Sequence, residues 1–297
     1  MRENDVDARH RSRVHSAVVI ALRIAAFLAV TYLAIVLIAW LVQDSLAFPA
    51  PRHILPDPGD LGARDGIRVS IAADDGIALH GWYLPPVPPP DSGRAPALLW
   101  FTGNMETVGA MGSVLLAMRP PGTAVLAVDY RGYGENDGRP TEGAVYRDAE
   151  AVWRWLETRP EVDAARIAVY GRSVGSAPAT WLVARHQPVA VVLDSPFTSA
   201  RDMAHQHYWF LPRFLTRLEL DNAERLRHAT MPVLILHGTD DRIAPFTMGR
   251  TLAAGIPRAT FVEIRGAGHN DTYTMGGAMY RDTVHAFLVE AFAAHAP

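Results

Sequence analysis

Short apolar runs alternate with segments of helical spacing along most of the chain. The runs lie at Ile67–Ala73, Ile77–Tyr83, Ala97–Phe101, Ala124–Asp129, Ile167–Tyr170, Val189–Leu193, Val233–Leu236 and Thr260–Ile264. The first two flank Asp74-Asp75-Gly76, whose Asp-Gly pair favours a hairpin turn. Short continuous apolar strands separated by helices are typical of a mostly parallel sheet covered on both faces. We therefore predict one α/β domain over residues 65–297, with no internal repeat and no second domain.

Helical patterns lie between most of these runs. The clearest covers Glu142–Thr158, where Val145, Ala149 and Val152 share one face. Thr141 directly precedes it, and threonine is a favoured N-cap because its hydroxyl accepts a hydrogen bond from an unpaired helix N–H. We therefore expect a helix that begins after Thr141.

The N-terminus has a different pattern, because Ile24–Val42 contains no charged residue. Its length is close to the roughly 20 residues that a helix needs to cross a bilayer. A cleaved signal peptide is the alternative, with Ser45-Leu46-Ala47 as its cleavage site. The apolar stretch is longer than the about 7–15 residues of a signal-peptide core. We expect an uncleaved membrane anchor over residues 16–43.

The arginines around this span predict its orientation. Four of them precede it, namely Arg2, Arg9, Arg11 and Arg13, whereas only Arg52 follows closely. Since basic residues favour the cytoplasmic side, residues 1–15 become a cytoplasmic tail. The proline-rich residues 44–64 are then an extended linker, and the domain that follows lies outside the cytoplasm.

Composition excludes several classes of function. The net charge of −3 offers no basic footprint for nucleic acid. The chain has no cysteine, which excludes disulfides, thiolate nucleophiles and cysteine-bound zinc. It also has no lysine, so neither a P-loop lysine nor a lysine Schiff base is available.

Gly171-Arg172-Ser173-Val174-Gly175 matches the pattern G-x-S-x-G. An apolar strand, Ile167–Tyr170, runs directly into it, and small residues suited to a helix follow. A serine on a sharp strand-to-helix turn needs small neighbours because its backbone is strained and the helix packs closely. The alternative is an ordinary turn with a capping serine. The context favours Ser173 as a nucleophile.

A nucleophilic serine needs a histidine to take its proton and a carboxylate to orient that histidine. Asp240 and Asp241 both follow the strand Val233–Leu236 and qualify by position. His269 lies on a later glycine-flanked loop, so we expect it to be the base. Asp194, after another strand, is a rival acid, whereas His237 is expected to be structural.

Four further segments complete a family pattern. They are Asp129–Gly134, Asp194–Ser199, His237–Asp241 and Gly266–Asn270. Together with the serine motif they resemble the α/β-hydrolase superfamily, and more closely its membrane-anchored α/β-hydrolase domain-containing branch, over roughly residues 65 to 295. The resemblance implies a mostly parallel eight-stranded sheet flanked by helices, with a minimal cap.

The resemblance also implies the roles of individual residues. It places the acid on Asp241, and it assigns the oxyanion-hole N–H groups to Val174 and to Asn104, with Met105 as the alternative to Asn104. One departure concerns the oxyanion loop: the family usually has His-Gly-Asn after the third strand, and here Thr102 replaces the histidine.

This resemblance implies a serine hydrolase that cleaves lipid-like esters or thioesters and requires no cofactor or metal. A serine aminopeptidase and a non-catalytic, membrane-tethered binding scaffold remain alternatives. Residues 197–230 lie where a cap is expected and include an aromatic cluster around Trp209 and Phe214. They form either an apolar lip for an acyl chain or a packed connecting helix. The sequence does not indicate the oligomeric state.

Overall fold

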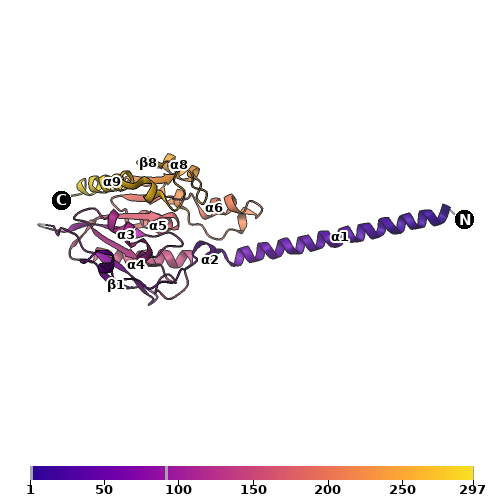
Figure 1. Ribbon diagram of the computed structural model, residues 1–297, viewed down its shortest axis with the longest axis horizontal. Helices are drawn as coiled ribbons and strands as arrows, with labels where there is room; N and C mark the ends of the chain where they lie inside the picture. The colour runs from indigo at the N-terminus through magenta and orange to yellow at the C-terminus, as the bar shows by residue number, and fades with distance from the viewer. Residues whose placement is uncertain (1–2, 91–92, 297) are drawn as a thin grey trace. The chain divides into compact units, whose positions relative to one another are not determined.

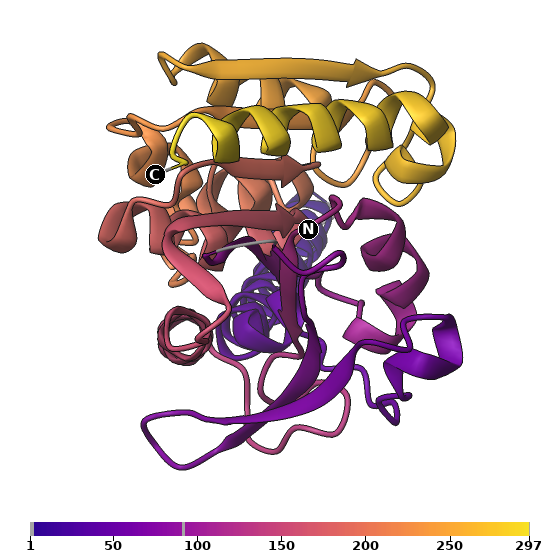
Figure 2. The ribbon, with the colours of Figure 1, turned by 90° about the vertical axis from the view of Figure 1, so that its left-hand side faces the viewer.

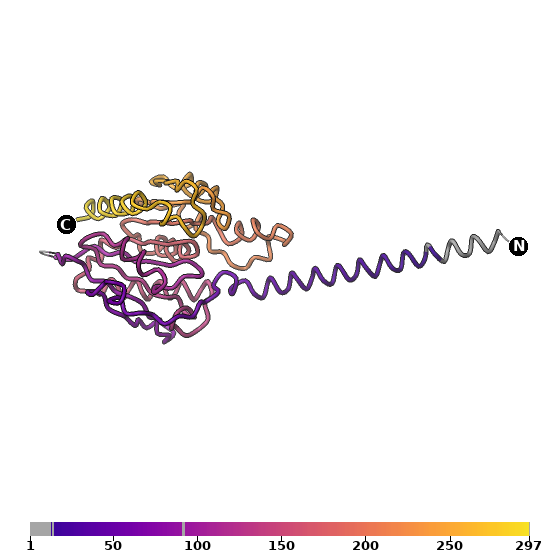
Figure 3. The backbone as a smooth tube through the Cα atoms, viewed as in Figure 1, coloured from indigo at the N-terminus to yellow at the C-terminus, as the bar shows by residue number. Residues whose placement is uncertain are grey.

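A computed structural model describes residues 3–90 and 93–296. The chain divides into two compact units, residues 1–43 and residues 44–297. Figures 1 and 3 trace the path of the chain through both. Arg2, one of the residues used to predict orientation, lies outside the described residues.

The first unit is the helix α1 (Glu3–Leu41). It contains neither glycine nor proline, so nothing in its backbone interrupts the hydrogen-bond ladder. Among the described residues, His15–Leu41 is the one helix long and apolar enough to cross a membrane, with a mean hydropathy of 2.6. Length and composition alone fit both an anchor and a signal sequence.

The second unit is built on one eight-stranded sheet. Its strands are β1 (Ile67–Ala72), β2 (Ala78–Leu84), β3 (Ala95–Phe101), β4 (Ala124–Val128), β5 (Val162–Arg172), β6 (Val191–Asp194), β7 (Val233–Gly238) and β8 (Ala259–Ile264). Their order is β1-β2-β4-β3-β5-β6-β7-β8, and only the pairs β1–β2 and β2–β4 are antiparallel. The predicted mostly parallel sheet is confirmed.

Helices cover both faces of this sheet. After α1, the helices are α2 (Gln43–Ala47), α3 (Val108–Met118), α4 (Glu142–Glu157), α5 (Ser176–His186), α6 (Ala200–His207), α7 (Asn222–Leu226), α8 (Phe246–Ala254) and α9 (Thr272–Ala293), with short 3₁₀ turns at η1 (Pro58–Leu61), η2 (Ser173–Gly175) and η3 (Arg213–Leu215). Buried residues of α3 and α9 share one core cluster, whereas those of α4, α5 and α8 share the other. In Figure 2, α9 in yellow runs alongside strands of the C-terminal half.

The helix expected after Thr141 is α4, and the Thr141 hydroxyl accepts from Ala144 N at 3.3 Å. The expected strand at 167–170 is longer in the structure. β5 begins at Val162 and is irregular against β3, because Ala95 pairs with Val162 but Ala97 pairs with Ile167. The first half of β5 contains polar residues, so the pattern of apolar residues did not predict it as a strand.

Residues 44–64, expected as a linker, lie within the second unit. Phe48 and Leu55 are each 2% exposed and belong to the two core clusters on opposite faces of the sheet. Trp82 Nε1 also donates to the carbonyl oxygen of Pro56 at 2.9 Å. This proline-rich segment therefore packs against the sheet through buried side chains.

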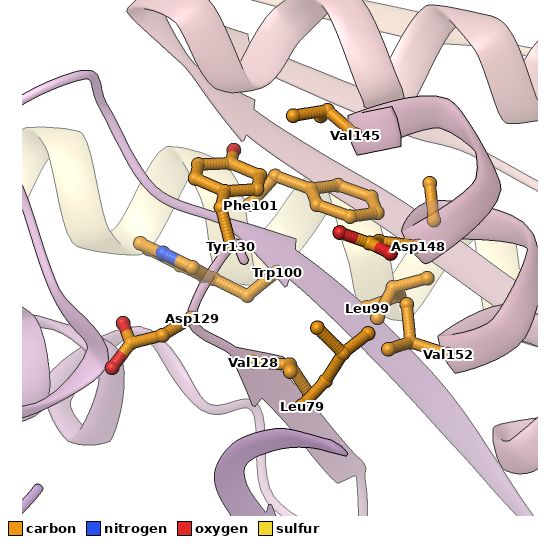
Figure 4. Close-up of a pocket in the computed structure, with 11 residues that line it drawn as sticks. Leu79, Leu99, Trp100, Phe101, Val128, Asp129, Tyr130, Val145, Asp148 and Val152 are labelled. Carbon is orange, nitrogen blue, oxygen red and sulfur yellow. The ribbon is translucent and has the colours of Figure 1, made fainter. Parts of the chain in front are cut away.

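A small cavity lies between β3, β4 and α4 (Figure 4). Asp129 and Asp148 lie on its wall among apolar side chains such as Leu99 and Val152. Its volume of about 10 Å³ matches roughly one water molecule. It is too small for an organic substrate.

Candidate active site

The serine lies at a sharp bend between β5 and the short η2 turn. Ser173 has φ +50°, a left-handed conformation that is strained for a residue with a side chain. A Cβ atom on Gly171 would lie 2.4 Å from the carbonyl oxygen of Gly175, and one on Gly175 would lie 2.5 Å from that of Phe101. Glycine is therefore required on both sides of the bend, which presents the serine hydroxyl at the end of the strand.

His269 bridges the serine and an aspartate. Its Nε2 lies 2.7 Å from Ser173 Oγ, and its Nδ1 lies 2.7 Å from Asp241 Oδ2. The imidazole and the carboxylate are buried, and the serine is partly exposed. The chain thus brings together three residues that lie 28 and 96 positions apart, because β5, β7 and the loop after β8 end at the same edge of the sheet.

Asp241 is held on both of its oxygens. Oδ1 accepts from the backbone N–H groups of Ile243 and Ala244, both at 2.9 Å. Oδ2 lies 2.7 Å from His269 Nδ1 and 3.2 Å from His237 Nε2. Burial alone would raise the pKa of Asp241, but hydrogen bonds from His237 and His269 outweigh it and hold the pKa well below its usual value. The carboxylate is therefore ionised at neutral pH.

The rival residues lie elsewhere. Asp240 is exposed and accepts from its neighbour Thr239. Asp194 is buried, but it contacts Arg172 and Thr272 rather than the imidazole. Within the described residues, no group of three or more histidine and carboxylate side chains is placed to hold a metal ion.

The loop after β3 is held by bonds to its backbone. Tyr130 Oη donates to the carbonyl oxygen of Thr102 at 2.9 Å, and Tyr133 Oη donates to that of Asn104 at 2.7 Å. Gly103 N donates to Glu106 Oε2 at 2.6 Å. Within the described part of the chain, the N–H groups of Asn104 and Met105 have no protein acceptor. Both remain available to a ligand.

Sequence reasoning missed Arg172 and Glu106. Arg172 is buried beside Ser173, where it pairs with Glu106 and with Asp194. A signal was present, because an arginine inside a buried strand is rarely tolerated without an ionic partner. The identity of its partners could not be deduced, since they lie 66 and 22 positions away.

The segment between α6 and α7 carries the expected aromatic cluster. Trp209 and Phe214 are 76% and 84% exposed, and Tyr208 is also exposed. Figures 1 and 3 show the α6 segment projecting from the rest of its unit. His207 Nε2 lies 2.7 Å from the carbonyl oxygen of Ile243, two residues after Asp241. The cluster is therefore attached to the loop that carries the acid.

Comparison with known proteins gives a consistent family. A family model described as serine aminopeptidase, S33, matches residues 94–224, and one described as TAP-like protein matches residues 208–294. The uncharacterized protein Rv2307c of Mycobacterium tuberculosis is 36% identical and covers 91% of this chain and 95% of its own length. The α/β-hydrolase domain-containing protein WAV2 of Arabidopsis thaliana is 30% identical and covers 73% of this chain and 77% of its own length.

The fold agrees with these relatives. An esterase structure from Pyrococcus furiosus, Pf2001, superposes with a TM-score of 0.66 at 21% identity, over 81% of this chain and 97% of that one. The chain belongs to the α/β-hydrolase superfamily, as the sequence motifs indicated.

Proposed function

We propose that this protein is a serine hydrolase that cleaves carboxylic ester or thioester bonds of lipid-like acyl substrates. The observation that carries the proposal is the hydrogen-bonded series Ser173–His269–Asp241, with 2.7 Å at each step. These separations lie within the range needed for proton transfer between a nucleophile, a base and its orienting acid.

The reaction would proceed by acyl transfer. Ser173 Oγ attacks the substrate carbonyl while its proton moves to His269 Nε2, and the ionised Asp241 stabilises the resulting imidazolium. The imidazolium then protonates the leaving alcohol or thiol, and an acyl-enzyme remains. Water, deprotonated by the same imidazole, hydrolyses the acyl-enzyme and restores the serine.

The oxyanion would bind to backbone N–H groups. We assign these to Val174, which follows the nucleophile, and to Asn104, with Met105 as the alternative. The free N–H groups of Asn104 and Met105 support this assignment. Backbone donors do not depend on the side chain at position 102. Because Tyr130 fixes the Thr102 carbonyl, the loss of the family histidine is compatible with activity.

Labelling with a fluorophosphonate probe tests the nucleophile. We expect the wild type to be labelled and Ser173→Ala to be unlabelled. Ser195→Ala is the matched control, because Ser195 also follows a strand with positive φ, +48°, but its hydroxyl donates to Asp194 Oδ1 at 3.4 Å. It should be labelled like the wild type. A folded wild type that resists labelling would indicate instead a non-catalytic scaffold.

The exposed aromatic side chains support an apolar acyl group. Trp209 and Phe214 lie on the segment attached to the acid loop through His207, where they offer an apolar surface near the site. Replacing both with serine should slow hydrolysis of long-chain p-nitrophenyl esters by about tenfold relative to short-chain esters. Equal changes in the two rates would exclude an acyl-binding role.

A serine aminopeptidase is the second candidate, favoured by the family model that matches residues 94–224. Such an enzyme has to bind an α-ammonium group. The acids beside the proposed triad, the partly buried Glu106 and the buried Asp194, are both bonded to Arg172 instead. We therefore expect p-nitrophenyl esters to be hydrolysed much faster than aminoacyl p-nitroanilides. The reverse preference would establish the peptidase.

The apolar helix supports membrane attachment. We infer that residues 16–43 remain as a single-pass anchor, which the apolar helix His15–Leu41 supports, with residues 1–15 in the cytoplasm and the hydrolase unit outside it. Protease treatment of sealed inverted membrane vesicles should then leave the hydrolase unit intact. Digestion of the unit in those vesicles would indicate the opposite orientation. A mature chain that begins after Ala47 would indicate cleavage at Ser45-Leu46-Ala47.

A further inference from the structure

The side chain of Arg172 connects three loops around the proposed nucleophile. Its Nη1 pairs with Glu106 Oε1 in the loop after β3, and its Nε lies 3.2 Å from Asp194 Oδ2 at the end of β6. Its Nη2 donates to the backbone carbonyl of His269 at 2.7 Å. All three donor nitrogens of the guanidinium are therefore used, in three directions.

Glu106 extends this connection into the proposed oxyanion loop. One of its oxygens binds Arg172, and the other accepts from Gly103 N at 2.6 Å. The backbone N–H of Glu106 donates back to the carbonyl oxygen of Gly103 at 3.3 Å. Through the carboxylate of Glu106, Arg172 therefore fixes the N–H of Gly103, the residue that immediately precedes Asn104.

Asp194 extends the connection in the other direction. Its Oδ2 accepts from Thr272 Oγ1 at 3.0 Å, and Thr272 is the first residue of α9. Arg172 thus holds the histidine loop twice, directly at the His269 carbonyl and indirectly at Thr272. The hydroxyls of Tyr170 and Tyr280 lie 2.8 Å apart beside it, and Tyr170 lies 3.4 Å from Asp194 Oδ2.

We propose that Arg172 is a positioning residue, which sets the distances between Ser173, the oxyanion-loop N–H groups and His269. The proposal rests on the function proposed above. A lysine at this position cannot replace it, because one ammonium nitrogen cannot reach three acceptors in different directions as a guanidinium fork does. Arg172 touches no reacting atom, so its contribution is expected in kcat rather than in KM.

Kinetics of the detergent-solubilised full-length protein with p-nitrophenyl butyrate test this role. Arg172→Met should lower kcat about 100-fold, with KM within about threefold of wild type, because misplacement by about 1 Å has effects of that size. Arg172→Lys and Glu106→Gln should each lower kcat about tenfold. These milder variants keep the test decisive if Arg172→Met does not fold.

The matched control is Arg119. It also donates in three directions, to Asp65 and to the carbonyl oxygens of Pro85 and Thr123. It lies at the opposite edge of the sheet, between α3 and the start of β4. Arg119→Met should lower the melting temperature but leave kcat within about twofold of wild type.

A double variant separates positioning from general destabilisation. If Arg172 acts through Glu106, adding Glu106→Gln to Arg172→Met should lower kcat little further, since the two changes break one connection. The proposal is overturned if folded Arg172→Met or Arg172→Lys retains wild-type kcat, or if only KM changes. Loss of labelling in Ser173→Ala would still support the proposed hydrolase in that case, so the two proposals fail separately.

Discussion

Asp241 and His237 form a buried pair at the end of β7, with 3.2 Å between Oδ2 and Nε2. The same nitrogen lies 2.8 Å from the carbonyl oxygen of Ala244, which can only accept. Nε2 therefore carries the proton, and the tautomer of His237 is fixed. The proposed catalytic acid thus receives two imidazole N–H groups, one from the proposed base and one from a residue that the sequence indicated only as structural.

Loss of His237 should affect folding more than chemistry. His237→Ala removes a fully buried ring and leaves the Ala244 carbonyl oxygen without its donor. We expect the unfolding free energy to fall by about 2–4 kcal/mol, measured by urea unfolding in detergent. Since His269 still binds Asp241, kcat of the folded fraction should fall less than about tenfold. A larger loss would assign His237 a direct part in orienting the acid.

Replacing the acid should abolish most turnover. Asp241→Asn keeps the size of the side chain but removes the charge that stabilises the imidazolium, so kcat should fall on the order of 10³–10⁴-fold. Asp240→Asn is the adjacent control and should remain within about twofold of wild type, because Asp240 is exposed and lies outside the hydrogen bonds of the triad. A larger loss of kcat in Asp240→Asn than in Asp241→Asn would indicate that Asp240 is the catalytic acid.

Stability should depend on pH through Asp129. Burial raises the pKa of this carboxyl to about 7, although the N–H of Val108 donates to it at 2.7 Å. The folded state then binds a proton that the unfolded state, with a pKa of about 3.9, has released. The resulting stabilisation is complete below about pH 4 and is lost as the pH rises through 7.

The pH dependence can be checked by measuring the unfolding free energy of the wild type and of Asp129→Asn at two pH values. Between pH 5.5 and 8.5 the wild type should lose about 2 kcal/mol of stability through this group, whereas the variant should lack that component. An asparagine oxygen can still accept from Val108 N. Equal pH slopes for the two proteins would contradict the prediction.

The bend between β5 and η2, which contains Ser173, should not accommodate even one added methyl group. Gly171→Ala places a Cβ 2.4 Å from the Gly175 carbonyl oxygen, so either the bend moves or the protein unfolds, and esterase activity is lost. Gly143→Ala is the matched control on α4, where the nearest atom lies 3.7 Å away. Because alanine favours helix, this variant should be neutral or more stable by up to about 1 kcal/mol. Fluorophosphonate labelling and thermal melting distinguish the two.

The eight strands were predictable because each contains a run of apolar residues, although only central strands such as β4, β6 and β7 are buried throughout, and the outer strands β1 and β8 are partly exposed. β5 was only half predicted, since the first half of this central strand, Val162–Arg166, contains polar and partly exposed residues. Ser173, Asp241 and His269, which the structure brings within hydrogen-bonding distance, could be proposed as a triad from their order in the chain and their positions after strands. Arg172 and Glu106 could not be paired from sequence, because their ion pair depends on β3 and β5 being neighbours.

The proline-rich segment was misleading for a related reason. Prolines between Phe48 and Asp60 are typical of an extended linker, and composition alone gives no sign that Phe48 and Leu55 are buried. Burial of these side chains depends on surfaces that form only when the sheet folds, such as Trp82 beneath Pro56. Local patterns do not contain that information.

Because Phe48 and Leu55 of the proline-rich segment are buried, they determine where a fragment of this protein without the apolar helix has to begin. A truncation at residue 65, where the first strand is about to start, would remove both side chains and open the two halves of the core to water. A fragment that begins at Asp44 would lack the apolar helix and keep the side chains of Phe48 and Leu55. Recombinant production, crystallisation and directed evolution of the α/β-hydrolase unit should therefore retain residues 44–64, about one-twelfth of that fragment, although the sequence alone suggests that they are dispensable.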